Sequence, residues 1–180
     1  MDVSPQQDSP TLLAGGTLTS AGFIGLLATQ FLTALNDNIF RWLVIGIAKD
    51  HVTEDQVGNV LMGGTLGFVL PYLVLAAPAG YLADRHPKRS VILGCKVAEI
   101  VIMALGIGAI LCGGWGAAWA LGLLMTTVAL MGGQSAMFSP ARAGSIPEVL
   151  KPELISKANG LFTLATVIAS VIGMVVGNAL

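Results

Sequence analysis

The chain has 180 residues, of which 54% are hydrophobic and only 11% are charged, and its formal net charge is −1. Too little polar side-chain surface is present to coat a water-soluble core of this size, so the composition indicates a membrane protein. The near-neutral charge argues against a nucleic-acid partner, because a phosphate-binding surface needs an excess of Lys and Arg.

Residues 1–16 are polar and carry Asp2 and Asp8 as their only charges. Such a segment cannot bury much apolar area, so we expect a disordered tail. The tail has no basic stretch of the kind that opens a cleaved signal peptide.

Long stretches with few charges follow, and they predict an all-α fold, a polytopic membrane helix bundle. About 20 helical residues cross a hydrocarbon layer that is about 30 Å thick. Five stretches meet this requirement. The expected spans are residues 20–48, 57–83, 91–111, 117–138 and 158–180.

The first expected span carries Asn36, Asp37, Asn38 and Arg41 in its second half. Asp37 and Arg41 are four residues apart, so they share a helix face and can neutralise one another. A charge pair at this depth is costly in lipid, so it should face the bundle or a water-filled cavity. The alternative is a helix that ends near Leu35, followed by an amphipathic segment on the membrane surface.

Small residues in two of the expected spans predict close helix packing. Gly63 and Gly67 are four residues apart in the second span, as are Gly173 and Gly177 in the fifth. Small residues at this spacing let two helix backbones approach closely. The prolines of the second span predict a kink whose free carbonyl is satisfied by neighbouring helices.

A compact charged segment, residues 80–89, joins the second and third expected spans. It reads Gly-Tyr-Leu-Ala-Asp-Arg-His-Pro-Lys-Arg. One acid and three bases between two apolar spans must lie in water or among lipid headgroups. The excess of basic residues marks a cytoplasmic turn. Alternatively, these charges only determine the orientation of the chain in the membrane and have no further role.

The third expected span contains Lys96 and Glu99, which are three residues apart. Lys96 is close enough to the cytoplasmic end to extend its ammonium group toward water. The two side chains are spaced for a local salt bridge. The alternative is that Glu99 binds a proton, a cation or a polar headgroup.

Residues 100–141 contain no charge, and 42 uncharged residues suit two crossings better than one. Glycines 113, 114 and 116 around Trp115 supply the break between them. We expect a cytoplasmic loop after the fourth span, containing Pro140, Arg142 and Pro147.

The distribution of basic residues predicts that the amino terminus is cytoplasmic. With that orientation, Lys49 is the only base in the outer loops. The cytoplasmic side collects Arg85, Lys88, Arg89, Arg142, Lys151 and Lys157.

The charged segment resembles the signature loop of the major facilitator superfamily of transporters, with Pro87 in place of the usual glycine. In that family the loop is a gating element and not the substrate site. The resemblance assigns this role to five residues: Gly80, Asp84, Arg85, Lys88 and Arg89. Such transporters place their substrate between two six-helix halves. Five spans therefore suggest an amino-terminal part of a longer transporter, whose remaining helices beyond Leu180 are partners of this part.

Two further stretches resemble the bacterial lysophospholipid transporters, some of which are fused to an acyltransferase. One is residues 31–41, with an acid flanked by asparagines; the other is residues 134–147, followed by Ala158-Asn159-Gly160. The resemblance implies a multi-pass protein of the bacterial inner membrane that flips lysophospholipid for re-acylation. Candidate substrate or coupling-ion residues are Asn36, Asp37, Asn38, Arg41 and Glu99.

Three other functions remain open at this point. A proton-coupled exporter of drugs or small solutes would share the charged segment, and Glu99 would suit proton coupling. A membrane-embedded lipid-modifying enzyme would need clustered acids or an activated nucleophile, and the sequence offers neither. A scaffold protein is the third. We expect no cofactor and no metal.

Overall fold

The computed structural model describes residues 16–50, 52–113 and 118–180, which form a bundle of long helices. The all-α membrane bundle expected from the sequence is confirmed. The expected tail lies outside the described residues, apart from Gly16. The long helices are α1 (Ala21–Lys49), α2 (Val57–Arg85), α3 (Lys88–Gly113), α4 (Ala118–Val149) and α5 (Ile155–Ala179), with short 3-10 helices at Glu54–Gln56 and Pro152–Leu154.

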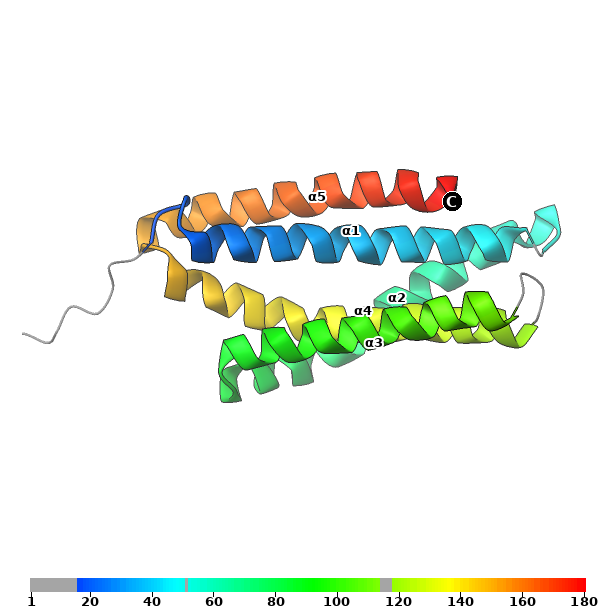
Figure 1. Cartoon of the computed structure of the whole chain (residues 1–180), viewed down its shortest axis with the longest axis horizontal. Coiled ribbons are helices and arrows are strands. Elements are labelled where there is room, and N and C mark those ends of the chain that lie inside the picture. Colours follow the sequence, from blue (N-terminus) through cyan, green and yellow to red (C-terminus); the bar gives the residue numbers. More distant parts are fainter. Residues whose placement is uncertain (1–15, 51, 114–117) are drawn as a thin grey trace, which may run out of the picture.

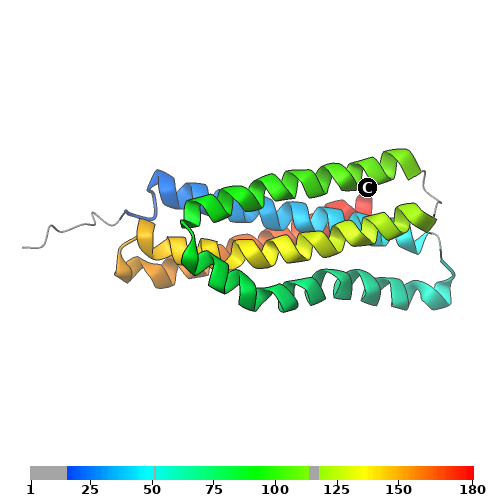
Figure 2. The same cartoon turned by 90° about the horizontal axis from the view of Figure 1, so that it is seen from below.

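The helices run alternately up and down and form two layers (Figures 1 and 2). One layer contains α1 and α5, which lie side by side. The other contains α2, α4 and α3, with α4 in the middle and in contact with both neighbours. Helix α1 also contacts α4 and α2, so it joins the two layers.

Four of the helices, α2 to α5, are long and apolar enough to cross a membrane. Their outward side chains include Val74, Ile100 and Leu111, which are 71%, 69% and 78% exposed. Helix α1 has 29 residues and a length of about 43 Å, which also suffices for a crossing. Its middle carries the polar and charged residues Asn36, Asp37, Asn38 and Arg41, and α1 lies against α5 and α4.

Apolar side chains pack into two separate clusters along the length of the bundle. One joins α1, α5 and the end of α4 through Phe23, Phe162 and Ile146, and the two phenylalanine rings meet edge to face at 5.7 Å. The other joins α1, α3 and the start of α4 around Phe40 and Val128. The two clusters fix α1 near both of its ends.

The contact between α1 and α5 depends on two of the glycines expected to pack closely. A Cβ atom at Gly173 would lie 2.6 Å from Cβ of Asn38, and one at Gly177 would collide with the carbonyl oxygen of Ile39. The expectation for this pair is confirmed. Gly63 and Gly67 make no such contact with the other described helices, because a Cβ built at either position meets no neighbouring atom within 4 Å.

Helix α4 continues beyond the point where a loop was expected, so the prediction of a loop at Pro140, Arg142 and Pro147 is wrong. All three residues are helical, and α4 ends only at Val149. The fixed φ of proline is compatible with a helix, and each proline removes only one backbone donor. In a packed membrane helix, neighbouring groups compensate that loss, so proline does not end the helix.

The charged segment contains less loop than expected, because only His86 and Pro87 lie between α2 and α3. Gly80, Asp84 and Arg85 belong to the end of α2. The side chains of Arg85 and Tyr81 stack, with the guanidinium 4.4 Å from the ring centroid. The segment is therefore a tight joint between two helices.

Candidate functional site

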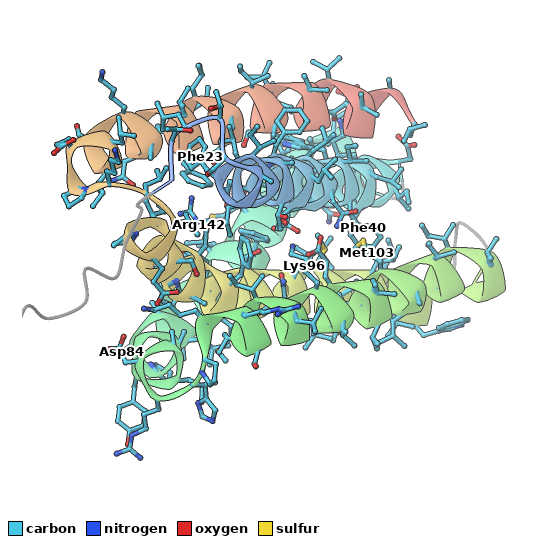
Figure 3. All side chains as sticks on the ribbon, turned by 60° about the vertical axis from the view of Figure 1, so that its left-hand side comes forward. Phe23, Phe40, Asp84, Lys96, Met103 and Arg142 are labelled. Atoms are coloured by element: carbon cyan, nitrogen blue, oxygen red, sulfur yellow. The ribbon has the colours of Figure 1, made fainter. Side chains whose placement is uncertain are left out.

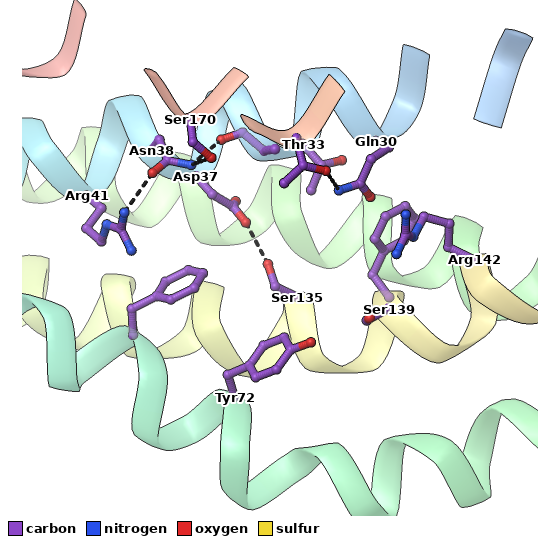
Figure 4. A pocket seen from close by; sticks show the side chains of 14 residues that line it. Gln30, Thr33, Asp37, Asn38, Arg41, Tyr72, Ser135, Ser139, Arg142 and Ser170 are labelled. Atoms are coloured by element: carbon purple, nitrogen blue, oxygen red, sulfur yellow. Dashed lines mark hydrogen bonds between the residues drawn. The ribbon is translucent and has the colours of Figure 1, made fainter. Parts of the chain in front are cut away.

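A cavity of about 390 Å³ lies between the two helix layers, in the middle of the bundle (Figure 4). We call it the polar cavity. Helices α1, α2, α4 and α5 all contribute to its wall. Its polar side chains are Gln30, Thr33, Asp37, Asn38, Arg41, Tyr72, Ser135, Ser139, Arg142, Thr166 and Ser170.

Among the described residues, Asp37 is the only acid that lines the polar cavity, and it is 7% exposed. Its Oδ2 atom accepts a hydrogen bond of 2.6 Å from the hydroxyl of Ser135 on α4. Its Oδ1 atom is buried and has no hydrogen-bond partner. A buried carboxylate needs a counter-charge or several donors, so one hydrogen bond leaves this group poorly compensated.

Two arginines line the same cavity. Arg41 donates a hydrogen bond of 2.7 Å to Oδ1 of Asn38, and its guanidinium lies 5.2 Å from the centroid of the Phe68 ring. Arg142 lies 5.0 Å from the centroid of the Phe162 ring, and its buried Nε has no partner. The cavity thus combines one acid with two cations.

The expectation that Asp37 and Arg41 share a face is correct, but they do not form an ion pair. The two ion pairs among the described residues are Lys96–Glu99 and Lys88–Glu148. Asp37 and Arg41 each bind a neutral side chain, as Figure 4 shows. Their charges remain available to a third group.

Neutral hydrogen bonds hold the α1 wall of the polar cavity against α5. The Nε2 atom of Gln30 donates to the hydroxyl of Thr166 at 2.8 Å, and Nδ2 of Asn38 donates to the hydroxyl of Ser170 at 3.1 Å. These bonds add to the glycine contacts described above. Asn38 is therefore a structural link as well as a partner of Arg41.

A second polar group, which we call the paired cluster, lies between α1 and α3 and consists of Thr33, Asn36, Lys96 and Glu99. Lys96 pairs with Glu99 and donates a hydrogen bond to Thr33. Asn36 donates to the other oxygen of Glu99 at 3.3 Å. The ammonium of Lys96 also lies 4.5 Å from the centroid of the Phe138 ring. The expected salt bridge is present, so the charge of Glu99 is compensated.

The five candidate residues for binding substrate or a coupling ion thus belong to two sites. Asp37, Asn38 and Arg41 face the polar cavity, whereas Asn36 and Glu99 belong to the paired cluster. Asp84 lies at the end of α2, away from the labelled Lys96 and Arg142 (Figure 3). Lys88 pairs with Glu148 at 2.7 Å and so ties the start of α3 to the end of α4.

Sequence reasoning missed the contribution of α4, although the pattern contained a signal. Ser135, Ser139 and Arg142 follow one another at intervals of four and three residues, which places them on one helix face. This spacing was not recognised as one helix face, because a loop was expected after residue 138. Tyr72 and Ser170 carry no comparable signal, because each is an isolated polar residue in an apolar span.

Arg85, Lys88, Arg89, Lys151 and Lys157 lie where α2 and α4 end and α3 and α5 begin. Figure 1 shows that these helix ends lie at the same end of the bundle, which we call the basic end. Lys49 lies at the opposite end with Asp50, Glu54 and Asp55. Among the described residues, no group of three or more His, Cys, Asp or Glu side chains is placed to hold a metal ion.

Comparison with known proteins gives a family and named relatives. The model of the Major Facilitator Superfamily matches residues 11–180. A lysophospholipid transporter LplT from Serratia proteamaculans and one from Yersinia enterocolitica are each 30% identical over 175 residues. The transporter of the same name from Yersinia pestis is 29% identical.

These alignments cover 96% of this chain but only 39% of each relative. The chain therefore spans about two fifths of the length of the curated relatives that it matches. No solved structure gives a significant match.

Proposed function

Because this chain belongs to the Major Facilitator Superfamily, we propose that it forms the substrate-contacting part of a transporter that moves lysophospholipid across the membrane by alternating access. The family and the named relatives are those of a transporter rather than an enzyme. The lipid substrate is suggested by the names of the relatives and by the charges of the polar cavity.

The observation that carries the proposal is the poor compensation of Asp37. Its Oδ1 atom has no partner, although it lies inside the bundle at membrane depth. An ionisable side chain in this position is expensive to keep, and such residues usually contact a transported ion or substrate. A cationic group on a substrate would supply the missing partner.

The two arginines suit the other half of a zwitterionic headgroup. A phosphoethanolamine group carries a phosphate and an ammonium, and guanidinium groups bind phosphate through several hydrogen bonds. We assign the ammonium to Asp37 and the phosphate to Arg41 and Arg142. These side chains replace the water that hydrates the headgroup, which lowers the free-energy cost of moving it through the bilayer. The acyl chain meanwhile stays in apolar surroundings.

Proton-coupled export is the weaker alternative. That function would use Glu99 as the site of protonation, but Glu99 is paired with Lys96 and receives a hydrogen bond from Asn36. Both carboxylate oxygens of Glu99 therefore already have partners. Uptake that requires a pH gradient would nevertheless favour this alternative.

For the joint between α2 and α3 we propose the gating role that the family resemblance implies. Asp84 and Arg89 are exposed at the basic end and are separate from the polar cavity. Asp84→Ala should therefore slow conformational cycling more than it weakens substrate binding. Equal loss of affinity and of transport rate in this variant would contradict that division.

The proposal is tested by Asp37→Asn in the intact protein, with uptake of labelled lysophosphatidylethanolamine into cells as the measurement. We expect uptake to fall more than tenfold at an unchanged amount of inserted protein, because a lost contact between buried charges costs about 2–5 kcal/mol. The matched control is Asp55→Asn, the same change at an exposed acid. Unchanged uptake in Asp37→Asn would refute the assignment.

A further inference from the structure

A second pocket, of about 380 Å³, opens on the outer side of the bundle, and we call it the side pocket. Residues at the end of α2, the start of α3 and the middle of α4 line it. Most of the wall is apolar and includes Leu82, Val91, Ala98 and Met137. The pocket shares no residue with the polar cavity, so it is a separate site.

Two polar residues of the wall, His86 and Ser90, mark the end of the side pocket that lies at the joint between α2 and α3, and Arg89 is next to Ser90 in sequence without being part of the wall. His86 and Ser90 belong to its wall and are exposed. Arg89, between them in sequence, is exposed and has neither a carboxylate nor an aromatic ring as a partner among the described residues. Lys88 is paired with Glu148, so Arg89 supplies positive charge that no group in the bundle compensates.

One atom of a buried side chain in the wall also lacks a hydrogen-bond partner. Gln134 is 7% exposed and donates from Nε2 to the carbonyl oxygen of Cys95 at 3.0 Å, which fixes the orientation of its amide. Its Oε1 atom has no partner. The wall of an otherwise apolar pocket thus contains one unused hydrogen-bond acceptor.

We propose that the side pocket binds one anionic diacyl phospholipid of the surrounding membrane. The apolar wall between α2, α3 and α4 accommodates an acyl chain. The phosphate lies at the joint, near Arg89 and the hydroxyl of Ser90. An anionic lipid fits better than a zwitterionic one, because the exposed basic excess of the joint needs a negative partner.

This inference concerns a lipid that remains in the membrane and is not transported. A lipid in the side pocket contacts α2 and α3 at their joint and α4 through Met137. It therefore links three helices where α2 and α3 themselves make few contacts. The bound lipid stabilises the joint for which we propose the gating role.

The test is native mass spectrometry of the intact protein in detergent with equal amounts of phosphatidylglycerol and phosphatidylcholine. We expect the protein to retain phosphatidylglycerol preferentially. Arg89→Gln should weaken this retention about fivefold, the effect of one basic residue near an anionic lipid. Lys151→Gln, an exposed basic residue outside the pocket, is the matched control and should leave retention unchanged.

A second pair of variants tests the apolar part of the pocket. Gly94 lines the pocket, and a Cβ atom there meets nothing within 4 Å, so Gly94→Leu should fill the space without displacing the helices. We expect it to abolish the lipid adduct. Gly108→Leu, also on α3 and also without a neighbour within 4 Å, should leave the adduct intact. Ala98→Leu fills the same pocket and replaces Gly94→Leu if the latter does not insert.

Three results would overturn the proposal. The first is equal retention of the two lipids by the unmodified protein. The second is a lipid adduct that survives both Gly94→Leu and Ala98→Leu. The third is an adduct that persists in those variants but is lost in Asp37→Asn, which would place the lipid in the polar cavity.

Discussion

The two sides of α1 present acids in opposite situations. Toward α3, Glu99 pairs with Lys96 and receives a hydrogen bond from Asn36. Toward α4, Asp37 receives one hydrogen bond, from Ser135, and its other oxygen has no partner. Both acids lie within helices that form the membrane bundle, so the surrounding medium does not explain why Glu99 has a charged partner and Asp37 has none.

The comparison separates a charge with a partner in the structure from one for which we propose a functional role. A pair such as Lys96 and Glu99 can persist at membrane depth because each charge stabilises the other. Asp37 has no such partner among the described residues, and we propose that a group entering the polar cavity supplies one. The predictions below change one side of this comparison at a time, in order of decreasing effect.

The largest effect is expected when the paired cluster loses one partner. Glu99→Ala leaves the ammonium of Lys96 without its counter-ion. The two side chains are 26% and 13% exposed, and breaking a fully buried pair costs about 3–5 kcal/mol, which is the upper limit for this partly buried pair. Thermal unfolding in detergent should show a strongly destabilised protein. The double variant Lys96→Met/Glu99→Leu should recover most of the loss, because apolar side chains replace the whole pair. A double variant as unstable as Glu99→Ala would show that the pair has another role.

Ser135→Ala should have a smaller effect, on the other side of α1. The change removes the only hydrogen bond to Asp37, and an unsatisfied buried acceptor costs about 1–3 kcal/mol. We expect lower stability and several-fold slower uptake of lysophospholipid. Ser135→Thr keeps the hydroxyl and should keep most of the uptake. Equal loss in the two variants would mean that the hydrogen bond is unimportant.

Gly173→Ala tests the contact that fixes the rotation of α1 and so decides which face meets the polar cavity. The added Cβ would lie 2.6 Å from Cβ of Asn38 and 2.9 Å from the carbonyl oxygen of Leu35. Overpacking of this kind costs about 1–3 kcal/mol. Gly160→Ala on the same helix meets nothing within 4 Å and should stabilise by about 0.5–1 kcal/mol. This packing would be contradicted if Gly173→Ala and Gly160→Ala changed the free energy of unfolding in the same direction.

The smallest effect is expected for the exposed ion pair at the basic end. The side chains of Lys88 and Glu148 are 29% and 58% exposed, and exposed pairs contribute about 1 kcal/mol or less. Lys88→Ala should therefore change the free energy of unfolding far less than Glu99→Ala does. A comparable loss from both variants would contradict this ranking of the two pairs.

Much of the fold was predictable from hydrophobic length alone. Five long helices follow from five apolar stretches, and Gly173 with Gly177 correctly marked a close helix contact. The extension of α4 was not predictable in this way, because Pro140 and Pro147 are typical of loops.

The candidate site was predictable in part. A charge within an apolar stretch identifies Asp37 and Arg41 without any structure. Their hydrogen-bond partners depend on how α1 is rotated against α4 and α5, which one sequence does not specify. For the same reason, the assignment of Asn36 and Glu99 to a different side of α1 needed three-dimensional contacts.

The central claim is that the polar headgroup enters the polar cavity beside Asp37. The most direct test places a cysteine there with Ser135→Cys, after Cys95 and Cys112 are replaced by serine, and follows its reaction with a charged thiol reagent in sealed vesicles. The account predicts that the cysteine reacts and that lysophosphatidylethanolamine slows the reaction. A cysteine that does not react, or that reacts equally fast with and without the lipid, would contradict it.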